Sequence, residues 1–227
     1  SGSPAPGPAG WTGDMLKVLS NDEVCLAGLA AIVLDICNGD IRDDDSRSLL
    51  LASRLIAFPS RHKIRPIAVG EVLYRASVLF LLSHIKLSSI FSSIQYGVGV
   101  SGGVEGAIHA LQASIEKPET AVLSVDFSNA FNTRKRSVLA NALFACQPAS
   151  LLFRVFHWSY RSSSHLCFFD NRTLSHTLSS DEGLRQGDPL SPLVFALSVQ
   201  HIYEQATAEG NGRVSSHAFL DDFNLVS

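Results

Sequence analysis

The fold is decided by the stretch Val214-Ser215-Ser216-His217-Ala218-Phe219-Leu220-Asp221-Asp222-Phe223-Asn224-Leu225-Val226. Two short runs, 214–220 and 223–226, flank two consecutive acids, which predicts two strands joined by an acidic turn. Strands and helices interleave elsewhere, but this strand-acid-strand ending favours an antiparallel sheet over a doubly wound parallel one. The sequence therefore predicts an α+β fold in which helices flank an antiparallel sheet.

A second acid ends an apolar run upstream, Ala121-Val122-Leu123-Ser124-Val125-Asp126. This pattern predicts a buried strand that delivers a carboxylate to a site at its end. Asp126 and Asp221 lie 95 residues apart and could converge from neighbouring strands. Carboxylates are the ligands that Mg²⁺ prefers, and two such ions about 4 Å apart serve nucleotidyl transfer. A strand-terminal Asp also serves as a backbone cap, and turns favour Asp, so these residues alone leave both interpretations open.

Composition bounds the class of protein. The 227 residues are 46% hydrophobic, enough for a packed core, and no apolar run approaches the roughly 20 residues of a membrane span. The four cysteines lack CxxC spacing, which argues against structural zinc and a disulfide framework. A net charge of −3 does not favour a nucleic-acid binder, although cations gather within 54–75 while acids gather within 40–45.

Local patterns predict the remaining elements. Asp22 and Gly39 bound an amphipathic helix as its N-cap and its stop. Two strands, 54–58 and 63–69, are expected around a turn at Pro59-Ser60, and a glycine-rich loop at 95–103. A short helix is expected after the acidic loop at 40–45, up to about residue 53. Further helices are expected at 71–90, 105–116, 136–145, 148–160 and 189–208, and a hairpin at 165–178.

Four blocks then occur in a telling order: Arg65-Pro66-Ile67-Ala68-Val69-Gly70, Asp126-Phe127-Ser128-Asn129-Ala130-Phe131-Asn132, Gly183-Leu184-Arg185-Gln186-Gly187-Asp188-Pro189-Leu190-Ser191-Pro192 and Phe219-Leu220-Asp221-Asp222. They resemble the fingers motif and three palm motifs of reverse transcriptases, especially the non-LTR retroelement and group II intron type. The resemblance covers about 54–227, and the ten-residue block is the most specific. Asn132 departs from the Asp of many relatives, and Phe219 from their Tyr or aliphatic residue.

The resemblance implies a polymerase right hand of fingers and palm, with an antiparallel palm sheet flanked by helices. The expected parts are a flexible lead-in at 1–20, N-terminal helices and fingers at 21–120, and palm at 121–227. The chain stops five residues after Asp222, so the helical thumb of such enzymes is expected to be absent from it. This isolated piece is expected to be inactive.

The resemblance also implies a catalytic site. Asp126, Asp221 and Asp222 are expected to be catalytic and to bind two Mg²⁺ ions, with Mn²⁺ as a substitute. Phe131 stands where relatives place an aromatic ring against the sugar C2′, which predicts exclusion of a 2′ hydroxyl and preference for dNTPs. A core phenylalanine beside a strand is the alternative interpretation.

The remaining implied contacts are to the incoming nucleotide. Lys63, Arg65 and Arg75 are cations that could reach its triphosphate, although surface cations are commonly just solvated. The other expected nucleotide-binding residues are Phe127, Gln186 and Gly187; for the last two, a turn leading into an N-capped helix is the alternative account. The loop at 95–99 resembles a template-contacting stretch, and is otherwise a glycine-rich connector.

The predicted function is that of an RNA-directed DNA polymerase fragment of a retroelement. The expected partners are an RNA template, a DNA primer, dNTPs, the missing thumb and fused endonuclease or other retroelement domains, with no membrane. The alternatives are a degenerate, non-catalytic structural or RNA-binding module and, less favoured because of Phe131, an RNA-directed RNA polymerase. The expected location is intracellular: nuclear in a eukaryote and cytoplasmic in a bacterium.

Overall fold

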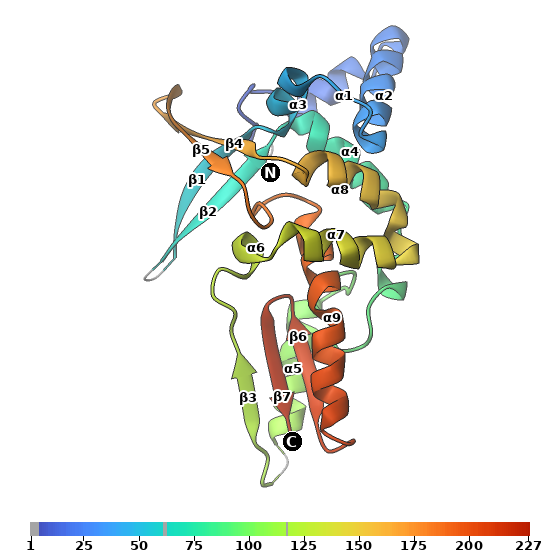
Figure 1. Ribbon diagram of the computed structural model, residues 1–227, viewed down its shortest axis with the longest axis vertical. Helices are drawn as coiled ribbons and strands as arrows, with labels where there is room; N and C mark the ends of the chain where they lie inside the picture. Colours follow the sequence, from blue (N-terminus) through green and yellow to red (C-terminus); the bar gives the residue numbers. More distant parts are fainter. Residues whose placement is uncertain (1–4, 61–62, 117) are drawn as a thin grey trace. The chain divides into compact units, whose positions relative to one another are not determined.

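The predicted acidic hairpin is present and provides two strands of a three-stranded sheet. In the computed structural model, β6 (Ser215–Phe219) pairs antiparallel with β7 (Asp222–Val226), and β3 (Val122–Val125) pairs antiparallel with the other edge of β7. The strand order is β3-β7-β6 (Figure 1). The structure thus confirms the α+β class and the antiparallel sheet.

The structure describes residues 5–60, 63–116 and 118–227, with the side chains of Ser60 and Lys63 also outside the description. Within these residues the chain forms two compact units, each built from two segments. The first unit combines the described residues of 1–84 with 151–191, and the second combines those of 85–150 with 192–227. Each unit is described by itself below.

The first unit contains a four-stranded sheet of order β2-β1-β4-β5. Strands β1 (Ser53–Ser60) and β2 (Lys63–Gly70) form one antiparallel hairpin, and β4 (Ser164–Asp170) and β5 (Thr173–Ser180) form another. A short parallel pairing of β1 with β4 joins the two hairpins. Segment 151–191 therefore groups with the N-terminal part of the chain, a pairing that the linear division at residue 121 did not include. That division stays a prediction.

Helices accompany this sheet in the first unit: α1 (Gly13–Leu19), α2 (Glu23–Asn38), α3 (Asp44–Leu51), α4 (Val72–Ser83) and α8 (Phe153–Tyr160). The α2 helix begins and ends as predicted. Asp22 accepts a hydrogen bond from the Cys25 amide, and Gly39 takes the left-handed conformation beyond the C-terminus. Because α2 packs on α4 and α8, its last turn is buried at Ile36 and Cys37.

The second unit contains four α-helices among its described residues: α5 (Gly103–Ile115), α6 (Ala130–Thr133), α7 (Arg136–Ala145) and α9 (Ser191–Glu209), which starts at the boundary of the first unit. Its 3-10 helices are η1 (Leu87–Ser89) and η2 (Gln147–Leu152), the last two residues of which belong to the first unit. The α5 helix contacts β6 and β7. Tyr203 of α9 stacks on Phe223 of β7, with ring centroids 4.1 Å apart. The α9 helix is thereby fixed to the strand that begins with Asp222.

Three local predictions were wrong. The β3 strand is not buried, because it lies at the edge of its sheet and leaves Leu123 60% exposed. Pro59-Ser60 is not a turn but the end of β1, opposite Ile64 and Lys63. The helix expected at 71–90 ends at Ser83, where His84 closes it. Among the described residues, no helix combines the length and apolarity needed to cross a bilayer.

Candidate functional site

The predicted acids of the second unit lie at one end of its sheet. Asp126 directly follows β3, and Asp222 is the first residue of β7. Val125 pairs with Phe223 across these antiparallel strands, so the residue after Val125 and the residue before Phe223 lie at the same end. Figure 1 shows β3 and β7 side by side. Asp126 and Asp222 are exposed, so their carboxylates are open to solvent or a ligand, whereas Asp221 is half-buried.

Tyr203, which the sequence did not single out, lies against this acidic turn. Its hydroxyl donates a hydrogen bond to the Leu220 carbonyl oxygen at 3.0 Å. Burial raises the pKa of the Tyr203 phenol, and the carboxylates of Asp221 and Asp222 raise it further. The phenol therefore stays protonated as a donor, while the two carboxylates act on it as fixed negative charges. From the sequence, Tyr203 was only one residue of a predicted helix, because the helical pattern does not reveal its contact with the acidic turn.

The three acids provide the oxygen ligands that divalent metal ions such as Mg²⁺ prefer. Among residues 5–60, 63–116 and 118–227, no three His, Cys, Asp or Glu side chains converge into a closed metal-binding cluster. Mg²⁺ does not require one, because it commonly keeps several waters and is held by one or two carboxylates plus substrate phosphates. Oxygen donors from two adjacent strand ends provide that kind of open donor set. Asp126, Asp221 and Asp222 are therefore compatible with Mg²⁺ held jointly with a phosphate ligand.

Phe131 lies on α6, just after the acidic strand end. Its half-buried ring stacks on Phe195 of α9, with centroids 4.6 Å apart and an interplanar angle of 21°. Asn129, at the N-terminal end of α6, has a φ of 52°, which turns the chain sharply from β3 into this helix. The stack fixes where the ring lies, so both a core role and a substrate-facing role are compatible with its position.

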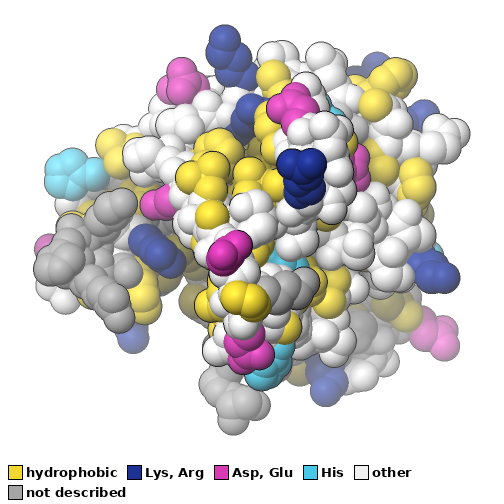
Figure 2. Space-filling model, turned by 90° about the horizontal axis from the view of Figure 1, so that it is seen from below, with side chains coloured by type: hydrophobic (Ala, Val, Ile, Leu, Met, Phe, Trp, Pro, Cys, Tyr) yellow, Lys and Arg dark blue, Asp and Glu magenta, His cyan; other side chains and the backbone are white. Residues whose placement is uncertain are grey.

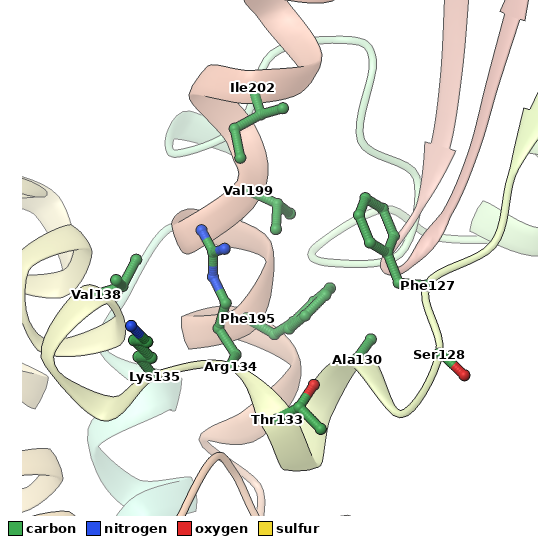
Figure 3. A pocket seen from close by; sticks show the side chains of 10 residues that line it. All are labelled: Phe127, Ser128, Ala130, Thr133, Arg134, Lys135, Val138, Phe195, Val199 and Ile202. Atoms are coloured by element: carbon green, nitrogen blue, oxygen red, sulfur yellow. The ribbon is translucent and has the colours of Figure 1, made fainter.

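A cavity of about 340 Å³ lies beside α6, α7 and α9 (Figure 3). Phe127 is on one side and Val138 and Lys135 are on the other, with Phe195 and Val199 between them. Arg134 crosses to α9, where its Nη2 donates to the Ser198 carbonyl oxygen at 2.6 Å. Phe127 therefore lines a hollow with both apolar and cationic walls, and its assignment to the nucleotide site stays a prediction.

Gln186 and Gly187 belong to the first unit, where their backbone docks on β2. The Ala68 amide donates to the Gln186 carbonyl oxygen at 2.7 Å. Gly187 has a φ of 108°, and a Cβ there would lie 2.7 Å from the Ala68 carbonyl oxygen. Only glycine allows this approach without displacing the strand, because any side chain would clash with backbone. The loop between Arg185 and Asp188 is thus seated on the strand that carries Arg65.

A buried ion pair that the sequence did not predict closes this loop. Arg185 Nη2 lies 2.8 Å from Asp188 Oδ2, and both side chains are 2% exposed. The hydroxyls of Tyr74 and Tyr160 each donate to the same oxygen at 2.8 Å. Burial raises the pKa of Tyr160 to about 12, and the Asp188 carboxylate adds to the rise. Four polar side chains therefore satisfy one another's hydrogen-bonding groups next to Gln186-Gly187. Tyr74 lies 114 residues from Asp188 along the chain, so local sequence patterns could not reveal this contact.

Two of the three predicted cations of the first unit have described side chains. Arg65 is exposed on β2, and Arg75 donates to the Ala5 carbonyl oxygen at 3.2 Å. The Lys63 side chain lies outside the described residues. On the face shown in Figure 2, Lys and Arg side chains stand singly among uncharged ones, with Asp and Glu between them. Triphosphate contacts by these three cations stay predictions.

The chain has relatives among known proteins. Residues 56–227 match the family model described as reverse transcriptase (RNA-dependent DNA polymerase). The "Retrotransposable element SLACS 132 kDa protein" of Trypanosoma brucei gambiense is 32% identical over 200 residues, which is 85% of this chain but 16% of that protein.

Solved structures show the same fold at low sequence identity. Apo telomerase from Candida tropicalis, truncated from its C-terminal domain, has a TM-score of 0.56 at 11% identity, over 78% of this chain and 44% of that one. Telomerase from Candida albicans, in complex with a fragment of telomeric RNA, has a TM-score of 0.56 at 14% identity, over 82% and 39%. The chain thus spans less than half of each of these proteins. From the family match and the retrotransposon relative together, the chain belongs to the reverse transcriptase family.

Proposed function

We propose that this chain is the fingers-and-palm part of a retroelement's RNA-directed DNA polymerase, which adds dNTPs to a DNA primer on an RNA template. The observation that carries the proposal is the placement of Asp126 and Asp222 at one end of an antiparallel sheet, within the region that matches the reverse transcriptase family. Template, primer and nucleotide are proposed from that family membership. The thumb and fused retroelement domains are proposed as parts of the whole protein.

In this proposal the three carboxylates bind the metal ions. Asp126, Asp221 and Asp222 hold two Mg²⁺ ions, which Mn²⁺ can replace; when bound, the ions lower the pKa of the primer 3′ hydroxyl and neutralise the leaving pyrophosphate. The carboxylates supply negative oxygen donors; the β6–β7 hairpin carries Asp221 and Asp222, and the end of β3 carries Asp126. Tyr203 stays protonated beside them and donates to the Leu220 carbonyl oxygen, so it does not compete with them as an anion.

The other proposed residues bind and select the nucleotide. Phe131 places its ring at the sugar and excludes the 2′ hydroxyl, supported by the Phe195 stack. Gln186 and Gly187 approach the nascent base pair through a loop whose backbone is anchored to β2. Lys63, Arg65 and Arg75 bind the triphosphate, Arg with a bidentate fork and Lys as a point charge.

Primer extension on an RNA template with dNTPs and Mg²⁺ tests the proposal, using the protein in its natural full length. Asp221→Asn removes one proposed ligand charge, and Asp35→Asn, an exposed acid on α2, is the matched control. We expect the Asp35→Asn variant to extend like the wild type and the Asp221→Asn variant to lose at least two orders of magnitude in rate. A wild type no faster than Asp221→Asn would refute catalysis and favour the non-catalytic module, and extension with NTPs in preference to dNTPs would favour an RNA polymerase.

A further inference from the structure

The residue before the two acids is held in an unusual backbone conformation. Leu220 has a φ of 58°, in the left-handed region that residues other than Gly, Asn and Asp rarely adopt. Such a conformation costs free energy and persists only where the surroundings fix it. Phe219 pairs with Asp222, so Leu220 is the first residue of a two-residue hairpin loop, a position that requires a positive φ. Leucine adopts this conformation at a higher cost than glycine, so contacts from outside the hairpin help to stabilise the turn that presents Asp221 and Asp222.

Two side chains provide those contacts by binding both polar backbone groups of Leu220. Gln95 Oε1 accepts a hydrogen bond from the Leu220 amide at 3.0 Å, and the Tyr203 hydroxyl donates to the Leu220 carbonyl oxygen at 3.0 Å. Gln95 is 2% exposed, so its bond is shielded from competing water. The amide and the carbonyl oxygen of Leu220 thus both form hydrogen bonds with protein side chains instead of with water.

The same Gln95 oxygen also binds the glycine-rich loop. It accepts a second hydrogen bond from the Gly97 amide at 2.9 Å. The loop runs beside β6, where the Tyr96 amide donates to the Ala218 carbonyl oxygen and the Ala218 amide donates to the Ile94 carbonyl oxygen, each at 2.8 Å. A Cβ on Gly97 would lie 2.8 Å from Leu220 Cγ, so the loop and the turn are in direct contact.

We infer that Gln95 is a positioning residue for the catalytic acids, and that its shared oxygen couples the conformation of loop 95–99 to that of the turn at Leu220. The inference rests on the proposed function for its catalytic consequence, but its structural content stands on the contacts alone. A displacement of the loop moves Gln95 Oε1, the acceptor that stabilises the left-handed conformation of Leu220. The positions of Asp221 and Asp222 shift as a result. Tyr203 holds the other side of the same peptide and acts on the acids independently of the loop.

Gln95→Leu tests this inference, with Gln200→Leu as the matched control. Gln200 is a glutamine of the same unit, 9% exposed, whose amide binds Ser92 and Glu204 instead of the turn. Hydrogen exchange of the full-length protein without substrate reports on the Leu220 amide directly. We expect exchange at Leu220 to rise about tenfold in Gln95→Leu, the effect of losing one buried hydrogen bond, and to stay within about twofold in Gln200→Leu.

Primer extension measures the catalytic consequence. We expect Gln95→Leu to raise the Mg²⁺ concentration for half-maximal rate about tenfold, since displaced carboxylates bind the ions less well. The double variant Gln95→Leu/Leu220→Gly should recover most of this loss, because glycine adopts the left-handed conformation without an anchor. A general loss of folding would not be rescued in this way.

The two measurements separate the inference from the proposed function. Equal exchange at Leu220 in the Gln95→Leu, Gln200→Leu and wild-type proteins would overturn the positioning role, whatever their activity. Faster exchange in Gln95→Leu with no primer extension by the wild type would keep the positioning role and refute polymerisation. Faster exchange with an unchanged Mg²⁺ requirement would overturn the link between Gln95 and the acids.

Discussion

Removal of the Asp188 carboxylate should be among the most damaging single changes in the first unit. Its Oδ2 accepts hydrogen bonds from Tyr74, Tyr160 and Arg185, each at 2.8 Å, and its Oδ1 accepts from the Leu190 amide at 2.9 Å. Asp188→Ala would leave the Arg185 guanidinium, 2% exposed, without its counter-charge. A buried pair broken in this way costs about 3–5 kcal/mol, a large part of the total stability of a typical domain, about 5–15 kcal/mol.

Equilibrium unfolding in urea, followed by tryptophan fluorescence, measures this cost. Trp158, 2% exposed, lies in the same unit and reports on its unfolding. Asp44→Ala is the control, because its ion pair with Arg161 spans 3.6 Å at the surface and contributes at most about 1 kcal/mol. A loss below about 1 kcal/mol in Asp188→Ala would refute the reasoning, since it would mean that Arg185 finds water or another partner at no cost.

Two further predictions concern the second unit. Phe131→Ala should increase incorporation of NTPs relative to dNTPs about tenfold in primer extension with each nucleotide set, which corresponds to roughly 1.4 kcal/mol of discrimination. The control Phe144→Ala removes a ring that is 71% exposed on α7 and should leave the ratio unchanged. An unchanged ratio in Phe131→Ala would contradict the sugar-selecting role. Burial lowers the pKa of His217 below its ordinary value of 6.5, so the folded unit disfavours the charged ring and should lose stability as the pH falls below about 6.5. Urea unfolding between pH 5 and 7 should therefore show a steeper decline for the wild type than for His217→Gln, and parallel curves would contradict this assignment.

Local sequence determined the elements whose causes are local. Asp22 and Gly39 bounded α2 because an N-cap carboxylate and a left-handed glycine act within a few residues. The β6–β7 hairpin was predicted because the polar turn and the flanking strands are contiguous. The error at β3 has the opposite cause: an apolar run does not reveal whether the sheet continues beyond it, and here it ends.

Local sequence was thus sufficient to predict the antiparallel acidic hairpin and most of the helices, and it contains the four motif blocks that mark the family. The hydrogen bonds that hold two of those blocks in place depend on the tertiary structure. Gln95 reaches Leu220 across 125 residues, and Tyr74 reaches Asp188 across 114. Periodicity describes neighbours along the chain, whereas a buried hydrogen bond depends on which segments the fold brings together. The anchors of the acidic turn and of the Gln186-Gly187 loop could therefore be found only in three dimensions.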